Sequence, residues 1–187
     1  MRIVVVDNGG QWTHREWRVL RDLGVDAEIL PNSTPYEKLQ ADGAVLSGGA
    51  LSLEGTDTPL GRVAQWIDDA PIPVLGICVG HQFLGRHFGG RVARAPAAFG
   101  RVEVQIDVPA HPMFSGLSSP LPVWTNHNDQ VVELPRGWTR LAHSATCPIE
   151  AMAHPTRPLW SVQFHPEVEH TEGGREIFRH FVAQCGK

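Results

Sequence analysis

A cysteine lies at the centre of the stretch of this sequence that is best suited to covalent chemistry. Cys78 stands between two glycines in the order Gly76-x-Cys78-x-Gly80, which is the form of a nucleophile elbow with sulfur in place of the serine oxygen. The glycines permit a sharp turn from a strand into a helix that side chains would block. We therefore expect an exposed thiol at a helix N-terminus, where unpaired N–H groups and the helix dipole favour the reactive thiolate.

The alternative interpretation is a buried cysteine that ends a core strand, which is common for an isolated cysteine in an apolar run. Val74, Leu75 and Ile77 do form such a run. The flanking glycines and the polar pair His81-Gln82 favour the functional interpretation, because a core strand needs neither of them.

A cysteine nucleophile needs a base, a group that orients the base, and donors for the oxyanion. His165 is the best candidate base, because it follows an apolar segment and should lie at the carboxyl end of a strand. Pro166 favours an extended backbone at His165. Residues two apart in such a segment point the same way, so Glu167 can orient the imidazole, as the acidic member of a triad does. A surface turn is the alternative for an isolated His-Pro-Glu sequence.

Backbone N–H groups can serve as the oxyanion donors. One belongs to Val79, directly after the cysteine, and another comes from the turn Ser47-Gly48-Gly49. A plain tight turn is the simpler interpretation of Gly-Gly. Residues 47–52 are also similar to the SGGxDS phosphate loop of ATP pyrophosphatases, but Leu51 replaces its aspartate and no Walker A sequence is present, which disfavours nucleotide binding here.

In the first half of the chain, the elements that must position these residues alternate between apolar strands and helices. Strands are expected at 3–6, 25–30, 43–46 and 74–77, and helices at 12–23, 35–39, 58–67 and 82–88. This alternation indicates βαβ units, and hence a parallel sheet with helices on both faces. Ligands gather at the carboxyl ends of strands in such sheets, where Cys78 and His165 are both expected.

After Gly90 the pattern changes to strands separated by turns. Strands are expected at 101–108, 139–143, 149–154 and 159–164, a final helix at 174–183, and a surface loop at 109–122, where prolines and glycines are frequent. We therefore predict a flavodoxin-like or Rossmann-like three-layer α/β sandwich. Its mostly parallel central sheet should carry antiparallel additions from the C-terminal half.

Length and composition favour one domain over residues 1–187. With 16 basic and 20 acidic side chains, nothing indicates a nucleic-acid or membrane surface. The apolar run at the N-terminus is too short for a signal peptide or a membrane span, so a cytoplasmic location is expected. Three widely spaced cysteines, Cys78, Cys147 and Cys185, argue against a disulfide framework, and no metal-ligand spacing is present.

Two motifs together resemble those of the class I, or triad, glutamine amidotransferases. They are LGICVGHQ at 75–82 and QFHPE at 163–167, and their order after the Gly-Gly turn agrees with that family across nearly the whole chain. The resemblance implies that glutamine is hydrolysed through a γ-glutamyl thioester. Cys78 would be the nucleophile, His165 the general base and acid, and Glu167 the residue that orients His165.

The same resemblance implies further roles around the thiol. Gly49 and Val79 would donate their N–H groups to the oxyanion, and Gln82 would help to bind glutamine. It implies no metal and no cofactor in this chain.

Within this family, WTNHNDQV at 124–131 and VEHT at 168–171 are similar to the glutaminase part of GMP synthetases, although positions 126 and 128 and the turn at 48–52 depart from that pattern. The resemblance implies that Asn126, His127 and Asp129 bind substrate or contact the synthetase; a polar loop is the alternative. It also implies a heteromeric complex. A chain of 187 residues is too short to include an ATP pyrophosphatase domain as well, so that activity is expected on a separate subunit. That subunit would use ATP and magnesium to aminate XMP to GMP.

Two alternatives stay open. The first is a glutaminase that serves another synthase, such as anthranilate or aminodeoxychorismate synthase, or a stand-alone γ-glutamyl peptidase; the segment at 168–171 favours the GMP branch. The second is a non-catalytic regulatory module on the same fold. Loss of a triad member would mark such a module, and all three triad positions are occupied here.

Overall fold

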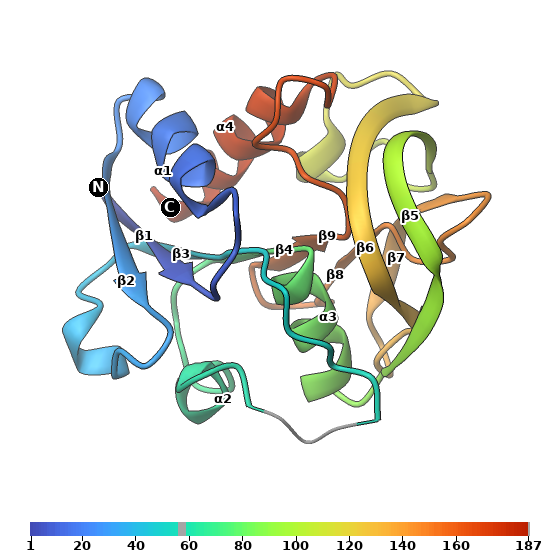
Figure 1. The fold of residues 1–187 in the computed structure, drawn as a ribbon. Coiled ribbons are helices and arrows are strands. Elements are labelled where there is room, and N and C mark those ends of the chain that lie inside the picture. Colours follow the sequence, from blue (N-terminus) through green and yellow to red (C-terminus); the bar gives the residue numbers. More distant parts are fainter. Residues whose placement is uncertain (56–58, 187) are drawn as a thin grey trace.

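A nine-stranded sheet, in the order β2-β1-β3-β4-β9-β8-β7-β5-β6, organises the chain. The computed structural model describes residues 1–55 and 59–186. Figure 1 shows α1 and α4 on one side of the sheet and α2 and α3 on the other, so the arrangement is the three-layer α/β fold that the sequence predicts. No helix in the described part of the chain is long and apolar enough to cross a bilayer.

Parallel strands form one half of the sheet. β1 (Arg2–Asp7) lies between β2 (Asp26–Pro31) and β3 (Gly43–Leu46), β3 pairs with β4 (Val74–Ile77), and β4 pairs with β9 (Leu159–Val162). The strands β3, β4 and β9 are buried along their whole length. This burial explains their continuous apolar sequences, because both faces of these strands are covered.

Antiparallel strands form the other half. β9 pairs with β8 (Ala151–Ala153), β8 with β7 (Thr139–Ser144), β7 with β5 (Arg91–Ile106), and β5 with β6 (Leu121–Glu133). The strand expected at 101–108 is therefore the second part of a longer β5. The strands expected at 139–143, 149–154 and 159–164 are present as β7, β8 and β9, with small differences at their ends.

No strand is expected at 124–131 from the sequence, and the alternative of a polar loop for His127 and Asp129 is wrong, because these residues belong to β6. Thr125, His127 and Asp129 point to the buried side of this strand, while Asn126 and Asn128 are exposed. Polar residues thus occupy both faces, which removes the alternation of apolar and polar residues by which a half-buried strand is normally recognised.

The helices begin and end close to their expected positions, with one exception. α1 (Thr13–Asp22), α3 (Val79–His87) and α4 (Gly174–Cys185) are regular helices, and the segment at 35–39 contains the short 3₁₀ helix η1 (Tyr36–Lys38). The helix expected at 58–67 is the exception, since α2 is a single turn at Val63–Trp66. Thr58, where that helix was expected to begin, lies outside the described residues.

The stretch 109–122 is not simply a surface loop. It contains the 3₁₀ helix η2 (Pro112–Phe114), in which Met113 and Phe114 are fully buried, and its last two residues belong to β6. Their apolar side chains extend the core, which a count of prolines and glycines could not reveal.

Two apolar layers lie on opposite faces of the sheet. Ile3 and Val5 of β1 belong to the layer under α1 and α4, and Val4 and Val6 belong to the layer over α2 and α3. Successive side chains of a strand point to opposite faces, so a short run of valines supplies both layers. Burial on both faces fixes the register of the parallel strands, and with it the positions of the turns at their carboxyl ends.

Candidate active site

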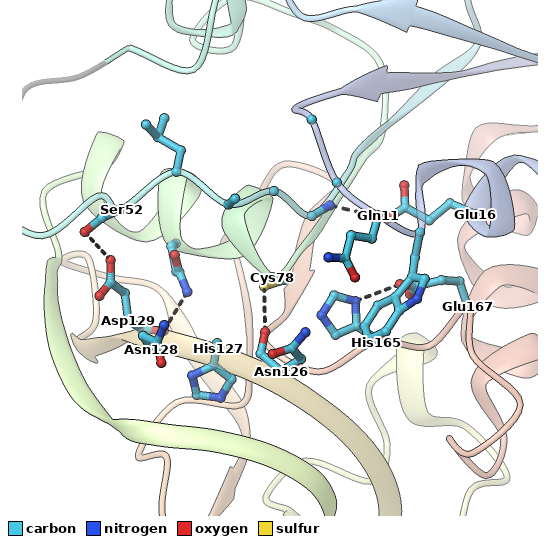
Figure 2. A pocket seen from close by; sticks show the side chains of 18 of the residues that line it. Gln11, Glu16, Ser52, Cys78, Asn126, His127, Asn128, Asp129, His165 and Glu167 are labelled. Atoms are coloured by element: carbon cyan, nitrogen blue, oxygen red, sulfur yellow. Dashed lines mark hydrogen bonds and ion pairs between the residues drawn. The ribbon is translucent and has the colours of Figure 1, made fainter.

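A cavity of about 370 Å³ lies where the carboxyl ends of β1, β3, β4 and β9 meet the middle of β6. Figure 2 shows the side chains that converge on it. Its walls come from 9–12, 48–52 and 126–129, together with Glu16, Cys78, Gln82, Arg94, His165 and Glu167. The cavity therefore occupies the edge of the parallel sheet at which ligands are expected.

Cys78 forms the turn between β4 and α3, with φ 51° and ψ −103°. A positive φ is uncommon for a residue with a side chain and is typical of a nucleophile elbow. A Cβ on Gly76 would lie 2.8 Å from the Gly80 carbonyl, and a Cβ on Gly80 would lie 2.4 Å from the Leu46 carbonyl oxygen. The spacing of the two glycines is thus required by the close approach of the backbone on both sides of Cys78.

The expectation of an exposed thiol is wrong, because only 5% of Cys78 is accessible. Its Sγ lies 3.9 Å from the carbonyl oxygen of Asn126 on β6. The turn does direct the thiol into the cavity, and the nearby backbone of β6 at Asn126 reduces its exposure to solvent.

His165 and Glu167 form a buried pair in which Nδ1 of His165 lies 2.7 Å from Oε1 of Glu167. Both side chains point the same way, as their spacing predicts. The backbone N–H of His165 donates to the Trp124 carbonyl, and the Thr171 hydroxyl donates to the His165 carbonyl. Thr171 in turn accepts from the N–H of Trp124, so the segment after β9 is fixed to β6.

Cys78 and His165 both lie close to the side of Gly48 on which a side chain would project. A Cβ added to Gly48 would be 3.3 Å from Cε1 of His165 and 3.6 Å from Cβ of Cys78. Burial alone would lower the pKa of His165, but the charge of Glu167, then the charge of Cys78 and hydrogen bonds to both residues, raise it well above its ordinary value. Trp12 packs edge-on against the imidazole with ring centroids 4.4 Å apart. The site therefore favours a protonated imidazole beside the sulfur.

The Gly-Gly turn after β3 packs against Asn8. The side-chain amide of Asn8 donates to the Ser47 carbonyl, and its backbone N–H donates to the Ser47 hydroxyl, both at 2.9 Å. A Cβ on Gly49 would lie 2.5 Å from the Asn8 carbonyl oxygen. Val79, directly after the thiol, is the first residue of α3, and its N–H is one of the helix's first four, which have no partner within the helix.

Gln82 and Asp129 hold the floor and the far wall of the cavity together. The amide of Gln82 donates to the Asp129 carbonyl at 2.6 Å and to Oε1 of Gln163 at 3.2 Å. The Asp129 carboxylate accepts from the Ser52 hydroxyl at 2.6 Å and from the Leu53 N–H at 3.2 Å. These contacts fix β6 against α3 and against the segment after β3.

Asn126 and His127 differ in exposure. Asn126 is exposed, and its carbonyl faces the thiol, whereas His127 is buried and its Nδ1 has no hydrogen-bond partner within the described part of the chain. Burial lowers the pKa of His127 to about 4, so the ring is neutral at neutral pH. All the residues to which the sequence assigns a catalytic, oxyanion or substrate role line the cavity except Val79, which directly follows Cys78.

Sequence reasoning missed several residues of the cavity. These are Gln11, Trp12, Glu16, Ser52 and Arg94. A signal was available for two of them. Trp12 follows the Gly9-Gly10 turn at the end of a strand, and Glu16 falls on the buried face of α1.

The remaining cysteines lie outside the cavity. Cys147 and Cys185 are free thiols, and burial raises the pKa of Cys185 to about 12 and that of Cys147 further. Both are therefore protonated and unreactive at neutral pH. Within residues 1–55 and 59–186, no group of three or more His, Cys, Asp or Glu side chains is placed to hold a metal ion.

A comparison with protein families matches residues 4–185 to the model described as glutamine amidotransferase class-I. The chain belongs to this family. Among class I glutamine amidotransferases, it is 51% identical over 187 residues to a Thermoplasma acidophilum protein named as a subunit of glutamine-hydrolyzing GMP synthase, covering 99% of this chain and 93% of that protein. It is 47% identical over 190 residues to the protein of the same name from Thermococcus kodakarensis, covering 99% of both.

The fold agrees with that of a solved relative. A crystal structure of a Thermoplasma acidophilum protein described as a subunit of GMP synthase superposes with a TM-score of 0.93 at 50% sequence identity, covering 100% of this chain and 94% of that one. The elbow, the Gly-Gly turn and the His-Glu pair thus lie within an amidotransferase fold that extends over the length of the matched relatives.

Proposed function

We propose that this chain is the glutaminase subunit of a two-subunit GMP synthase. It hydrolyses glutamine to glutamate and ammonia, and the ammonia passes to a separate ATP pyrophosphatase subunit that aminates XMP to GMP. The similarity to relatives named as subunits of glutamine-hydrolyzing GMP synthase, over nearly the whole length of each protein, carries the proposal. Residues 1–187 then form one glutaminase domain.

The reaction begins at the thiol. The thiolate of Cys78 attacks the carboxamide carbon of glutamine and forms a tetrahedral oxyanion. The imidazolium of His165 gives its proton to the departing nitrogen, the carbon–nitrogen bond breaks, and ammonia leaves behind a γ-glutamyl thioester. His165 then takes a proton from water, the resulting hydroxide attacks the thioester, and glutamate and the thiolate are released.

Three backbone or side-chain groups support these steps. Glu167 holds Nδ1–H of His165 at 2.7 Å, which fixes the tautomer and stabilises the imidazolium. The N–H groups of Gly49 and Val79 stabilise the oxyanion, a contribution worth about 3 kcal/mol for each donor in related acyl transfers.

The rest of the cavity binds and surrounds glutamine. Asn126, His127 and Asp129 of β6 form one wall, and Gln82 lies between that wall and the thiol. A neutral His127 suits a site for a substrate with no net charge. The walls also exclude bulk water, which protects the thioester until ammonia has left.

The partner subunit would bind the nucleotide and the metal ion that the synthesis of GMP requires. ATP and magnesium belong on the ATP pyrophosphatase subunit, and no cofactor takes part in the steps described for Cys78. We expect glutamine hydrolysis to be slow until that subunit binds, because free hydrolysis would waste glutamine.

The test is to combine the chain with its candidate ATP pyrophosphatase subunit, glutamine, ATP-magnesium and XMP, and to measure GMP. GMP should form with glutamine only when both chains are present, and with ammonium chloride when the partner is alone. Formation of GMP from ammonium chloride but not from glutamine would contradict the proposal. Equal rates of glutamine hydrolysis with and without the partner would remove the proposed activation.

A further inference from the structure

Glu16 has an ionisable side chain but lies on the buried face of α1, where apolar side chains are expected. The buried residues of α1 are Thr13, Glu16 and Leu20, which fall on one face of the helix. Only 1% of Glu16 is accessible. A carboxylate buried without a cation is strongly unfavourable, so its presence here needs a reason.

The contacts of Glu16 lead to the Gly-Gly turn. Its Oε1 accepts from the backbone N–H of Gly48 at 3.3 Å. Its Oε2 is buried and has no hydrogen-bond partner among the described residues, and none of the ion pairs in that part of the chain involves Glu16. The side chain lines the cavity together with His165 and Glu167, and it lies on the same side of the cavity as Glu167 (Figure 2).

The surroundings of Glu16 favour its neutral form. Burial raises its pKa most, followed by the charge of Glu167, whose own Oε2 is also buried without a partner among the described residues; Cys78 adds to this, while the Gly48 N–H and His165 act against it. Charged groups on the neighbouring elements are engaged elsewhere. On β1, Asp7 accepts from Gly9 and Thr13, and on α4, Arg175 donates to a carbonyl at the far end of α1.

We propose that Glu16 is a positioning residue of this site, whose buried carboxyl group holds the Gly48-Gly49 turn by accepting from the N–H of Gly48. This inference rests on the proposed glutaminase function. Gly48 is close to both Cys78 and His165, so the direction of its N–H affects how the following peptide, with the N–H of Gly49, faces the thiol. Remaining uncharged, Glu16 also leaves Glu167 as the one carboxylate that acts on the imidazole.

Two substitutions separate the hydrogen bond from the charge. Glu16→Gln keeps an acceptor for Gly48 and is permanently neutral, so kcat should stay within about threefold of wild type. Glu16→Leu removes the acceptor, and kcat should fall between about 10-fold and 100-fold, part of the loss seen when an oxyanion donor is removed outright. KM should change less than about threefold, because the substrate-binding wall is untouched.

Stability and thiol reactivity distinguish this role from a structural one. Glu16→Leu replaces a buried polar group by an apolar one on an apolar helix face, so Tm should stay equal to wild type or rise. Alkylation of Cys78 by iodoacetamide, followed by mass spectrometry, should proceed at the wild-type rate, because the thiol and imidazole remain in place. The matched controls are Glu37→Gln and Glu37→Leu at a position of η1 outside the cavity.

Each outcome decides the inference. A Glu16→Leu protein with wild-type kcat overturns it, as does one that loses Tm and kcat together, which would indicate a merely structural residue. A Glu16→Gln protein as impaired as Glu16→Leu overturns the uncharged state. The proposed function is tested separately, by whether the wild-type protein hydrolyses glutamine. The ratio of variant kcat to wild-type kcat is measured only if it does.

Discussion

The two halves of the sheet contribute to the cavity in different ways. The parallel half presents residues from the turns at its strand ends: Cys78 after β4, Gly48 and Gly49 after β3, and His165 after β9. The antiparallel half presents side chains from within a strand, Asn126 to Asp129 of β6. Turns leave backbone N–H groups unpaired and allow unusual backbone angles, whereas a ladder of hydrogen bonds holds a strand straight and its side chains still.

This contrast suggests a division of work. Bond making and breaking belong to the edge of the parallel half, and the shape of the substrate site belongs to β6. The division is not complete, because Trp124 of β6 and Thr171 hold the backbone of His165. The following changes test where the boundary lies, from the largest expected effect to the smallest.

Cys78→Ala removes the proposed nucleophile at the parallel edge. We expect kcat for glutamine to fall by at least about 10⁴-fold, as for other nucleophiles in triads. The fold should persist, since alanine fits wherever the side chain of cysteine does. Steady-state glutamate release measures kcat, and circular dichroism measures whether the fold persists. Cys185→Ala is the control. Residual activity near that of wild type would place the chemistry elsewhere.

Glu167→Gln keeps the shape of the side chain and removes its charge. Because that charge raises the pKa of His165, the imidazolium should be less stable in the variant and kcat should fall by about 1,000-fold with little change in KM. The matched control is Glu169→Gln, at an exposed position two residues further on. An unchanged kcat in Glu167→Gln would mean that the pair with His165 is structural only.

Glu150→Gln tests the antiparallel half away from the cavity. Burial raises the pKa of Glu150 from 4.5 to about 7, so the folded chain holds this proton more tightly than the unfolded chain. Stability should therefore fall as pH rises from 4.5 through 7, by about 3 kcal/mol in total, and the loss should be complete above pH 7. In the variant this loss should be absent.

Urea denaturation at pH 5 and pH 8 measures that difference. The free energy of unfolding of the variant should be closer to that of wild type at pH 5 than at pH 8. At pH 8 the variant should be the more stable protein. Its kcat should be unchanged, because Glu150 does not line the cavity. A loss of kcat instead of a change in stability would show that the antiparallel half takes part in the chemistry.

Asp129→Ala acts on the substrate wall. It removes the acceptor for the Ser52 hydroxyl and the Leu53 N–H, so the wall should loosen and KM for glutamine should rise about tenfold, which corresponds to about 1.4 kcal/mol. We expect kcat to change by less than about threefold, on the same scale of reasoning. Ser52→Ala should raise KM less, and the double variant should not exceed Asp129→Ala. A drop in kcat with unchanged KM would break the division between the halves.

The sequence predicts much of the parallel half, because its signals are local. A run of four apolar residues between turns specifies a buried strand at 43–46 and again at 74–77, and the structure has both. The glycines around Cys78 specify the elbow through steric limits on a few dihedral angles. The pairing of His165 with Glu167 follows from the two-residue period of an extended chain.

Only the tertiary structure decided the rest. The burial of Cys78 depends on β6, whose Asn126 is 48 residues away in sequence and whose polar residues hide its strand pattern. The place of Glu16 depends on the packing of α1 against the turn after β3. In both cases, segments distant in the sequence determine the environment of a side chain. Local backbone preferences do not predict which distant segment packs against it.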